Sequence, residues 1–350
     1  MAKAEDKSGS RLKFISYMQV LGIILVVLGH SMHEYPDGAL GSTTNFHMMI
    51  YSFHMPVFIF VSGYLMMLGI VRREQGVWEF TRKKLMRLVL PYVVLTLVTF
   101  IPRSLMSSFA DDSVEMSWGA LINALLYGKS LIIPYLWFLQ VCFMLLVSTF
   151  ILLKLGAKAR IRPLTLSCIL LLIYLAVLPS PGEEYTDFLS LDCLAVYGIY
   201  FFIGIIYNLL QDKIDRIVRW ESPLVFLSLV SIWAVTFFLT NYTIYAAICS
   251  VAGIAMCMSF AKIMEARDMT FLDHLVGANY MIFLLSWFCN VACQNVLHHF
   301  VKMPWWGYGL LSLITGIYLP MLAYRYLMSH PQSRWVRMTA LLLGQGKLKG

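Results

Sequence analysis

Charged side chains are scarce in this sequence. Asp, Glu, Lys and Arg make up 13% of its 350 residues, and hydrophobic residues make up 59%. Soluble domains carry about 25% charged residues. So few charges do not cover the exterior of a soluble chain of this length, and the composition therefore predicts a multi-pass membrane protein. The formal net charge of +8 then reflects Lys and Arg that collect on the cytoplasmic side of the membrane, and we expect no nucleic-acid partner.

Signatures of nucleotide loops, metal sites and disulfide frameworks are also missing. The sequence contains neither a GxxxxGK[ST] loop nor a GxGxxG turn, and none of its seven cysteines forms a CxxC pair. No Cys/His group has the spacing of metal ligands, so we expect no metal. The cysteines lie mostly within apolar runs and are expected to pack as small hydrophobic residues. No small-residue cleavage site follows the first apolar run, which we expect to be retained as a helix.

Long apolar runs dominate what is present, and runs of about 20 apolar residues cross a bilayer as helices. The runs lie at 14–33, 46–70, 88–107, 134–154, 163–179, 191–210, 223–240, 242–261, 276–297 and 306–328. They predict an all-α bundle of about ten transmembrane helices with both termini in the cytoplasm. We expect a cytoplasmic segment 1–13, a transmembrane domain 14–328 and a basic cytoplasmic tail 329–350. This topology leaves only Arg103, Lys129 and Lys302 among the 27 Lys and Arg outside, as the positive-inside bias requires.

An ionisable imidazole lies near the outer end of the first run, FISYMQVLGIILVVLGHSMHEYPD. Glu34 follows His30 by one helical turn, so its carboxylate is placed to orient the ring and raise its basicity. Gln19 lies about three turns earlier, roughly 16 Å deeper on a similar face. Polar side chains within a span usually face a cavity or the bundle interior, which favours a catalytic His30. A histidine wetted by the membrane interface is the structural alternative.

A second histidine belongs to the stretch FHMPVFIFVSGYL in the second run. His54 lies within the span, Pro56 follows it, and Ser62 and Tyr64 lie deeper. Pro and Gly let neighbouring backbones approach and free a carbonyl for side-chain contacts. These side chains are candidates for substrate contacts, and a packing kink around a hydrogen-bonded histidine is the alternative.

A basic segment, VRREQGVWEFTRKKLMRLVLPY, precedes and enters the third run. The planar guanidinium group of Arg and the ammonium group of Lys both bind phosphate groups well. Lys84 and Arg87 are three residues apart and are expected to project from one side of a helix that enters the membrane, with Arg82 just before them. The segment is a candidate site for a phosphate-rich cytoplasmic ligand. The alternative is an ordinary topology determinant that contacts anionic lipids.

Five stretches in a fixed order give the chain a family resemblance. They are VVLGHS, FHMPVFIFVSGYL, KKLMRLVLPY, LWFLQVCF and IYFFIGIIY. Together with ten expected helices, this ordered set resembles the acyltransferase 3 family of integral membrane acyltransferases, which are similar to bacterial sugar O-acetyltransferases. The resemblance covers roughly 14–210 of the chain, and the remainder matches mainly in hydropathy.

The resemblance implies an O-acyltransferase of the cytoplasmic (inner) membrane. Its donor would be cytoplasmic acyl-CoA, usually acetyl-CoA, and its acceptor a hydroxyl of a cell-envelope glycan or a similar molecule on the far side. It implies that His30 is catalytic, either as a general base or as a transient acyl carrier. It also implies that Lys84 and Arg87 grip the CoA phosphates. The family usually has Arg at the position that Gln19 occupies here.

The expected site has three parts, namely catalytic residues, CoA-binding residues and substrate-binding residues. The catalytic residues are His30 and Glu34. The CoA-binding residues are Lys84, Arg87, Arg82 and Gln19. The substrate-binding residues are His54, Ser62, Tyr64 and Trp137. A transporter or flippase of a glycan or small solute is the main competing hypothesis, although the sequence shows no inverted repeat. A catalytically lapsed membrane partner is the third, for which Gln19 is the best argument. Acyl transfer predicts release of CoA, which a transporter does not.

Overall fold

The computed structural model describes residues 2–31, 40–72, 75–105, 115–127, 135–178, 187–239, 243–301 and 303–346. These ranges contain helices and no β-strand, and one isolated β-bridge joins Tyr127 to Phe188. The all-α prediction is therefore confirmed for the described part of the chain.

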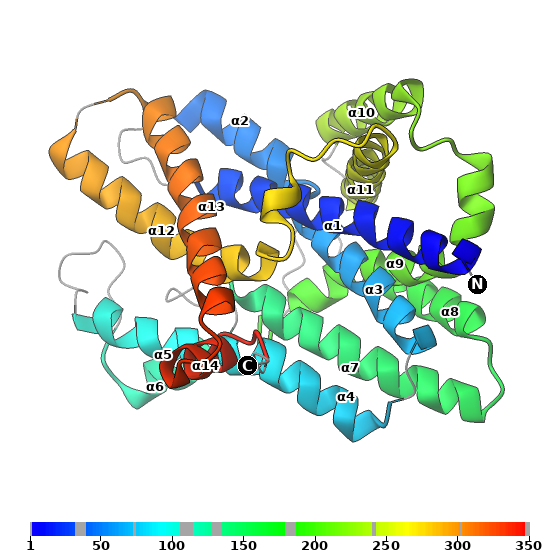
Figure 1. The fold of residues 1–350 in the computed structure, drawn as a ribbon, viewed down its shortest axis with the longest axis horizontal. Coiled ribbons are helices and arrows are strands. Elements are labelled where there is room, and N and C mark those ends of the chain that lie inside the picture. The colour runs from blue at the N-terminus through cyan, green and yellow to red at the C-terminus, as the bar shows by residue number, and fades with distance from the viewer. Residues whose placement is uncertain are drawn as a thin grey trace. The chain divides into compact units, whose positions relative to one another are not determined.

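Within the described ranges, fourteen α-helices follow one another, with a π-helical turn (η1) and a 3-10 turn (η3) between some of them, and Figure 1 shows their course. They are α1 (Ala2–Ser31), α2 (Leu40–Tyr51), α3 (His54–Arg72), α4 (Val77–Lys84), η1 (Leu85–Val89), α5 (Leu90–Leu105), α6 (Trp118–Leu126), α7 (Trp137–Lys158), α8 (Pro163–Ala176), α9 (Leu191–Ile217), α10 (Pro223–Phe238), α11 (Thr243–Ala266), η3 (Asp273–Leu275), α12 (Asn279–Phe300), α13 (Trp305–Ser329) and α14 (Arg334–Leu342).

Helices occupy each of the ten ranges that the sequence predicts to cross the membrane. Seven described segments are long and apolar enough to do so, and α8 and α10 are shorter apolar helices. The seven are Lys13–Ser31, Phe46–Ile70, Val77–Leu105, Trp137–Lys158, Leu191–Ile217, Ala246–Ala266 and Trp306–Ser329. The multi-pass membrane character is therefore confirmed, while the count of ten spans and the cytoplasmic position of both termini stay predictions.

The chain folds as two compact units. The first unit comprises Met1–Val61 and Leu210–Ser329, and the second comprises Ser62–Leu209 and His330–Gly350. The boundaries fall inside α3 and α9, so each of these two helices contributes residues to both units. The predicted division into segments 1–13, 14–328 and 329–350 concerns membrane topology and stays a prediction.

The first unit is built around α1, which packs against α2, α11, α12 and α13. The helices α10 and α11 pair with each other, as do α12 and α13. Met18, Val20, Ile23 and Val27 on α1 are fully buried. Val20, Ile23 and Val27 share one face and Met18 lies on the opposite face, as expected for a helix that is covered by neighbours on more than one side.

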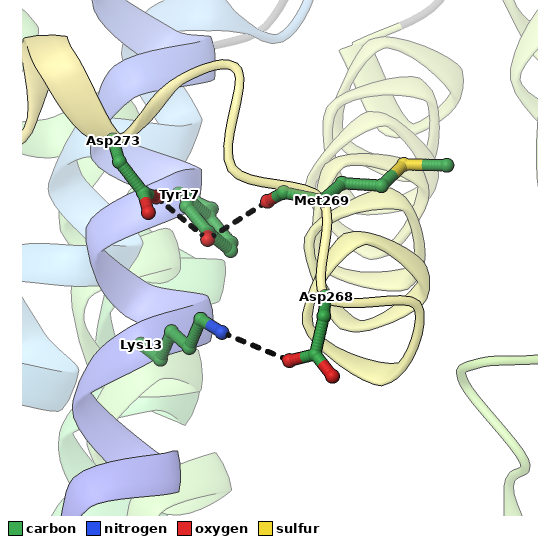
Figure 2. A network of polar contacts seen from close by, with 5 residues as sticks. All are labelled: Lys13, Tyr17, Asp268, Met269 and Asp273. Carbon is green, nitrogen blue, oxygen red and sulfur yellow. Dashed lines mark hydrogen bonds and ion pairs between the residues drawn. The ribbon is translucent and has the colours of Figure 1, made fainter.

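The middle of α1 is attached to the segment between α11 and α12 (Figure 2). The Tyr17 hydroxyl lies 2.8 Å from Asp273 Oδ1 and 3.0 Å from the Met269 carbonyl oxygen. Lys13 Nζ lies 3.4 Å from Asp268 Oδ1, and that Asp side chain is 91% exposed. Exposed ion pairs contribute little stability, so the buried Tyr17 carries most of this attachment.

A largely buried ion pair in the first unit links α11 to α9, beside α1. Lys262 Nζ on α11 lies 2.6 Å from Asp215 Oδ2 on α9, with the two side chains 13% and 28% exposed. Gln211 donates to the same carboxylate oxygen at 3.3 Å. The Lys262 ammonium also lies 4.9 Å from the centroid of the Phe14 ring on α1. Since a partly desolvated charge is costly without its partner, this pair ties α9 to α11 beside α1.

The second unit packs α4, η1, α5 and α7 together, with α6 and α14 against α5 and α8 against α7. The end of α6 is closed by side chains from other helices. Tyr92 donates to the carbonyl oxygens of Ala124 and Leu125 at 2.9 and 3.1 Å, and Gln140 donates to that of Leu125 at 3.2 Å. These donors satisfy carbonyls that have no partner within the helix.

The second predicted span is interrupted, whereas the sequence predicted one continuous helix over 46–70. Ser52 and Phe53 form a turn between α2 and α3. Ser250 donates to the Ser52 carbonyl oxygen at 2.6 Å, and the Trp233 indole donates to the Ser52 hydroxyl at 3.1 Å. The turn is stable within an apolar bundle because Ser250 provides a donor for its backbone carbonyl and Trp233 one for its side chain.

Candidate active site

His30 lies in the last turn of α1, beside the end of α2. Its Nδ1 atom lies 3.5 Å from the Tyr51 hydroxyl oxygen, and the two ring centroids are 6.3 Å apart at an interplanar angle of 80°. Both side chains are half-buried. A separation of 3.5 Å is at the long limit for a hydrogen bond. In the tautomer in which Nδ1 donates to Tyr51, Nε2 carries the lone pair that a general base needs.

Tyr51 is the centre of a group of rings that we call the His–Tyr cluster, formed by His30, His47, Tyr51 and His54. The centroid of Tyr51 lies 3.8 Å from that of His47 and 4.4 Å from that of His54. His54 is 3% exposed, and its Nδ1 lies 3.0 Å from the Ile50 carbonyl oxygen. Because a carbonyl oxygen only accepts, Nδ1 of His54 is the donor. His54 is thus a buried, hydrogen-bonded residue that also contributes to the cluster.

The absence of a side chain at residue 29 brings Tyr51 close to α1. A Cβ atom at Gly29 would lie 2.7 Å from Tyr51 Cε2 and 3.7 Å from Ile50 Cγ2. Real Cβ atoms do not approach other heavy atoms as closely as 2.7 Å, so any larger residue would displace the tyrosine ring. Gly29 therefore allows the contact between Tyr51 and the neighbouring His30.

The sequence singled out His30 and His54 but missed His47 and Tyr51. A signal for them exists, since residues 47, 51 and 54 have the i, i+4, i+7 spacing of one helical face. Gln19 lies half-buried on α1. Glu34, the predicted partner of His30, lies outside the described residues.

The cationic residues expected to bind phosphate lie on α4 and η1 of the second unit. Arg82 and Arg87 are exposed and Lys84 is half-buried, while Lys83 pairs with Glu79 at 2.6 Å. The predicted regular helix is replaced by a π-helical turn over 85–89, so Lys84 and Arg87 belong to different helical elements. Single π-helical turns within α-helices occur frequently at functional sites.

Two stacked phenylalanine rings lie next to these cations. We call these two rings, together with Lys84 and Lys154, the Lys–Phe ladder. The rings of Phe80 on α4 and Phe150 on α7 are 4.0 Å apart and nearly parallel at 3°. Lys84 Nζ lies 5.1 Å from the Phe80 centroid, and Lys154 Nζ lies 5.6 Å from the Phe150 centroid. Each such cation–π contact contributes about 0.5–1 kcal/mol at exposed sites. The Lys–Phe ladder therefore attaches α4 to α7.

The remaining predicted substrate residues lie in the second unit, on α3 and α7. The Ser62 hydroxyl lies 3.8 Å from the buried Cys142 sulfur, and Tyr64 is fully buried. Trp137 begins α7 and stacks on Tyr197, with centroids 4.9 Å apart at 26°. Over the described ranges, no group of three or more His, Cys, Asp or Glu is arranged to hold a metal ion.

Comparison with known families gives one match. Residues 12–325 match the sequence model of a family described as an acyltransferase domain. The matched range contains the whole His–Tyr cluster and the basic residues of α4 and η1. No curated protein and no solved structure matches the chain.

Proposed function

The chain belongs to the acyltransferase 3 family of membrane acyltransferases, and we propose that it is a multi-pass O-acyltransferase of the cytoplasmic membrane. Its donor is cytoplasmic acyl-CoA, with acetyl-CoA as the first donor to test. Its acceptor is a hydroxyl group of a cell-envelope glycan. The observation that carries this proposal is His30, which is held beside Tyr51 at the end of the central helix of the first unit.

His30 acts as the general base in this proposal. The acceptor hydroxyl gives its proton to Nε2 of His30 while its oxygen forms a bond to the carbonyl carbon of the thioester. The carbon–sulfur bond then breaks, and the CoA sulfur takes the proton back from the imidazolium and leaves as the free thiol. A well-placed base accelerates such a step by about 10²–10⁴-fold. Transient acylation of His30 itself is the covalent variant of the same route.

Tyr51 orients the base. With Nδ1 donating to the Tyr51 oxygen, the ring keeps the tautomer in which Nε2 accepts a proton, and the same contact stabilises the imidazolium that forms. Apo hydrogen bonds at catalytic sites are often long and tighten when the substrate is bound, which accommodates the 3.5 Å separation. Glu34 was predicted for this orienting role, and that part of the proposal rests on the sequence alone.

The donor's phosphates bind to the cations of the second unit. The proposal assigns this role to Lys84, Arg87 and Arg82, because guanidinium and ammonium groups suit phosphate oxygens. Gln19 replaces the family's usual Arg and supplies hydrogen bonds without a fixed charge. His54, Ser62, Tyr64 and Trp137 stay the substrate-contact residues that we propose from the sequence.

Release of CoA by the purified protein tests the proposal. The protein is reconstituted in lipid vesicles with acetyl-CoA and envelope glycan from cells that lack this protein, and free thiol and glycan acetylation are measured together. We expect both to appear with the wild type and to fall to background with His30→Ala. Ser259→Ala, which removes a buried hydrogen bond to Trp220 in the same unit, is the control and should keep the wild-type rate. Glycan movement without thiol release would instead indicate a transporter.

A further inference from the structure

The last turn of α1 is also held on the side that faces α12 and α13. Four buried polar residues from these three helices meet there, and all are at most 4% exposed. They are Ser31 on α1, Asn290 and Gln294 on α12, and Ser312 on α13. Buried polar groups are costly unless they are hydrogen-bonded, so such a group marks a fixed arrangement and not a packing accident.

Gln294 closes the end of α1. Its amide nitrogen donates to the carbonyl oxygen of Ser31 at 3.0 Å and lies 3.4 Å from the Ser312 hydroxyl. Ser31 is the last described residue of α1. The side chain of Gln294 therefore attaches α12 to the backbone of α1 one residue away from His30.

Asn290 joins the same turn to α13. With its amide nitrogen turned toward α13, it donates to Ser312 O at 2.8 Å and to Ser286 O at 3.2 Å. The opposite orientation gives longer contacts of 3.4 Å to Val27 O and 3.3 Å to the Ser31 hydroxyl. We assign the first orientation because its hydrogen bonds are shorter. In this orientation its hydrogen bonds go to α12 and α13, and its amide oxygen takes the place beside Val27 and Ser31 of α1.

The close approach of α13 requires a glycine. A Cβ atom at Gly316 would lie 2.0 Å from the Asn290 amide atom that is the nitrogen in the assigned orientation, and 2.7 Å from Val27 Cγ1. Any side chain at this position would therefore displace the Asn290 amide and the α1 residue one turn before the helix end. Gly316 gives a way to disturb the arrangement without removing a hydrogen-bonding group.

We propose that Gln294 and Asn290 are positioning residues for the acyl transfer step: Gln294 holds the last described turn of α1 directly and Asn290 holds α13 beside it, so that His30 faces Tyr51. Ser31 in this turn accepts a hydrogen bond from Gln294 on α12, and His30, one residue earlier, contacts Tyr51 of the His–Tyr cluster. The inference rests on the proposed acyltransferase function for its kinetic consequence. It does not rest on that function for the position of His30, which is measured separately.

The isosteric variants Gln294→Glu and Asn290→Asp test the proposal, because each replaces an NH₂ donor by a carboxylate oxygen that faces a carbonyl. We expect kcat for acetyl transfer to fall by about 10- to 100-fold, since a misplacement of about 1 Å costs roughly 10²-fold. KM for acetyl-CoA should stay within about twofold, because neither residue is assigned to the donor. Gly316→Ala should have the same effect through displacement alone.

The second readout is the reactivity of His30 toward diethyl pyrocarbonate, measured by mass spectrometry without acyl-CoA. We expect faster modification of His30 in Gln294→Glu and Gly316→Ala than in the wild type. The matched control is Gln211→Glu, which puts a carboxylate beside Asp215 and the Lys262–Phe14 contact. Along α1 that contact lies about 24 Å from His30, so this control should lose stability but keep wild-type labelling and kcat.

Unchanged His30 labelling and unchanged kcat in both Gln294→Glu and Gly316→Ala would overturn the proposal. Equal effects in the Gln211→Glu control would overturn it as well, because loss of stability would then explain them. If the wild type releases no CoA, the proposed function fails, whereas the labelling comparison still decides whether Gln294 and Asn290 position His30.

Discussion

The substitution Tyr51→Phe removes one oxygen atom from the His–Tyr cluster and keeps the ring between His47 and His54. A neutral hydrogen bond contributes about 0.5–1.5 kcal/mol net, and the 3.5 Å contact to His30 belongs at the low end. If the bond tightens when substrate binds, the upper end applies. Converted at about 1.4 kcal/mol per tenfold change in rate, this range predicts a fall in kcat of roughly 2- to 10-fold.

The comparison with His30→Gln gives the measurement its meaning. Loss of a general base lowers kcat by about 10²–10⁴-fold, so the two variants should differ by at least tenfold in the vesicle assay. Tyr308→Phe is the control, since it removes a hydroxyl that donates to Val301 O at 2.7 Å in the same unit. A loss of more than 100-fold in Tyr51→Phe would show that Tyr51 exchanges protons itself. Full activity of His30→Gln would remove the cluster from the chemistry.

Three further predictions concern other parts of the molecule. Gly29→Ala should lower kcat by about tenfold through displacement of the Tyr51 ring, with unchanged insertion by protease protection; an unchanged rate would contradict the close approach. Lys84→Gln combined with Arg87→Gln should raise KM for acetyl-CoA by about 100-fold, since hydrogen bonds to charged groups contribute about 1.5–3 kcal/mol each, with little change in kcat; unchanged KM would return these residues to a topological role. Lys262→Met should destabilise the protein by about 3 kcal/mol, the low end for a broken buried pair, because Asp215 is 28% exposed. Adding Asp215→Asn should recover part of the melting temperature measured in detergent, and no recovery would contradict the pairing.

Hydropathy was sufficient to find where the helices are. A segment that crosses a bilayer must satisfy its backbone hydrogen bonds internally, so a run such as 137–158 has little choice but to form α7. The same rule does not predict interruptions that side chains from distant helices stabilise. The break at Ser52 and Phe53 depends on Ser250 and Trp233, which lie about two hundred residues later. The π-helical turn at 85–89 is likewise invisible to a hydropathy pattern.

The candidate site was predictable where chemistry marks a single residue. An imidazole in an apolar run is costly, and His30 is therefore conspicuous in the sequence. Gln294 is an ordinary amide in a long helix, and its role becomes visible only once Ser31 O is found at 3.0 Å. Phe80 and Phe150 are two apolar residues among many, and their stacking depends on how α4 meets α7. Residues that matter through a contact with a distant residue are therefore the ones that a sequence alone does not identify.

The first helix is held at two points, at Tyr17 by the segment before α12 and at Ser31 by Gln294. These points are about 21 Å apart along a stiff rod, so the helix cannot slide along its axis without breaking one of them. The depth of His30 in the bilayer is consequently coupled to the conformation of residues 268–273, which the predicted topology places in the cytoplasm. If the predicted topology holds, a molecule that binds residues 268–273 from the cytoplasm should shift His30 without contacting it.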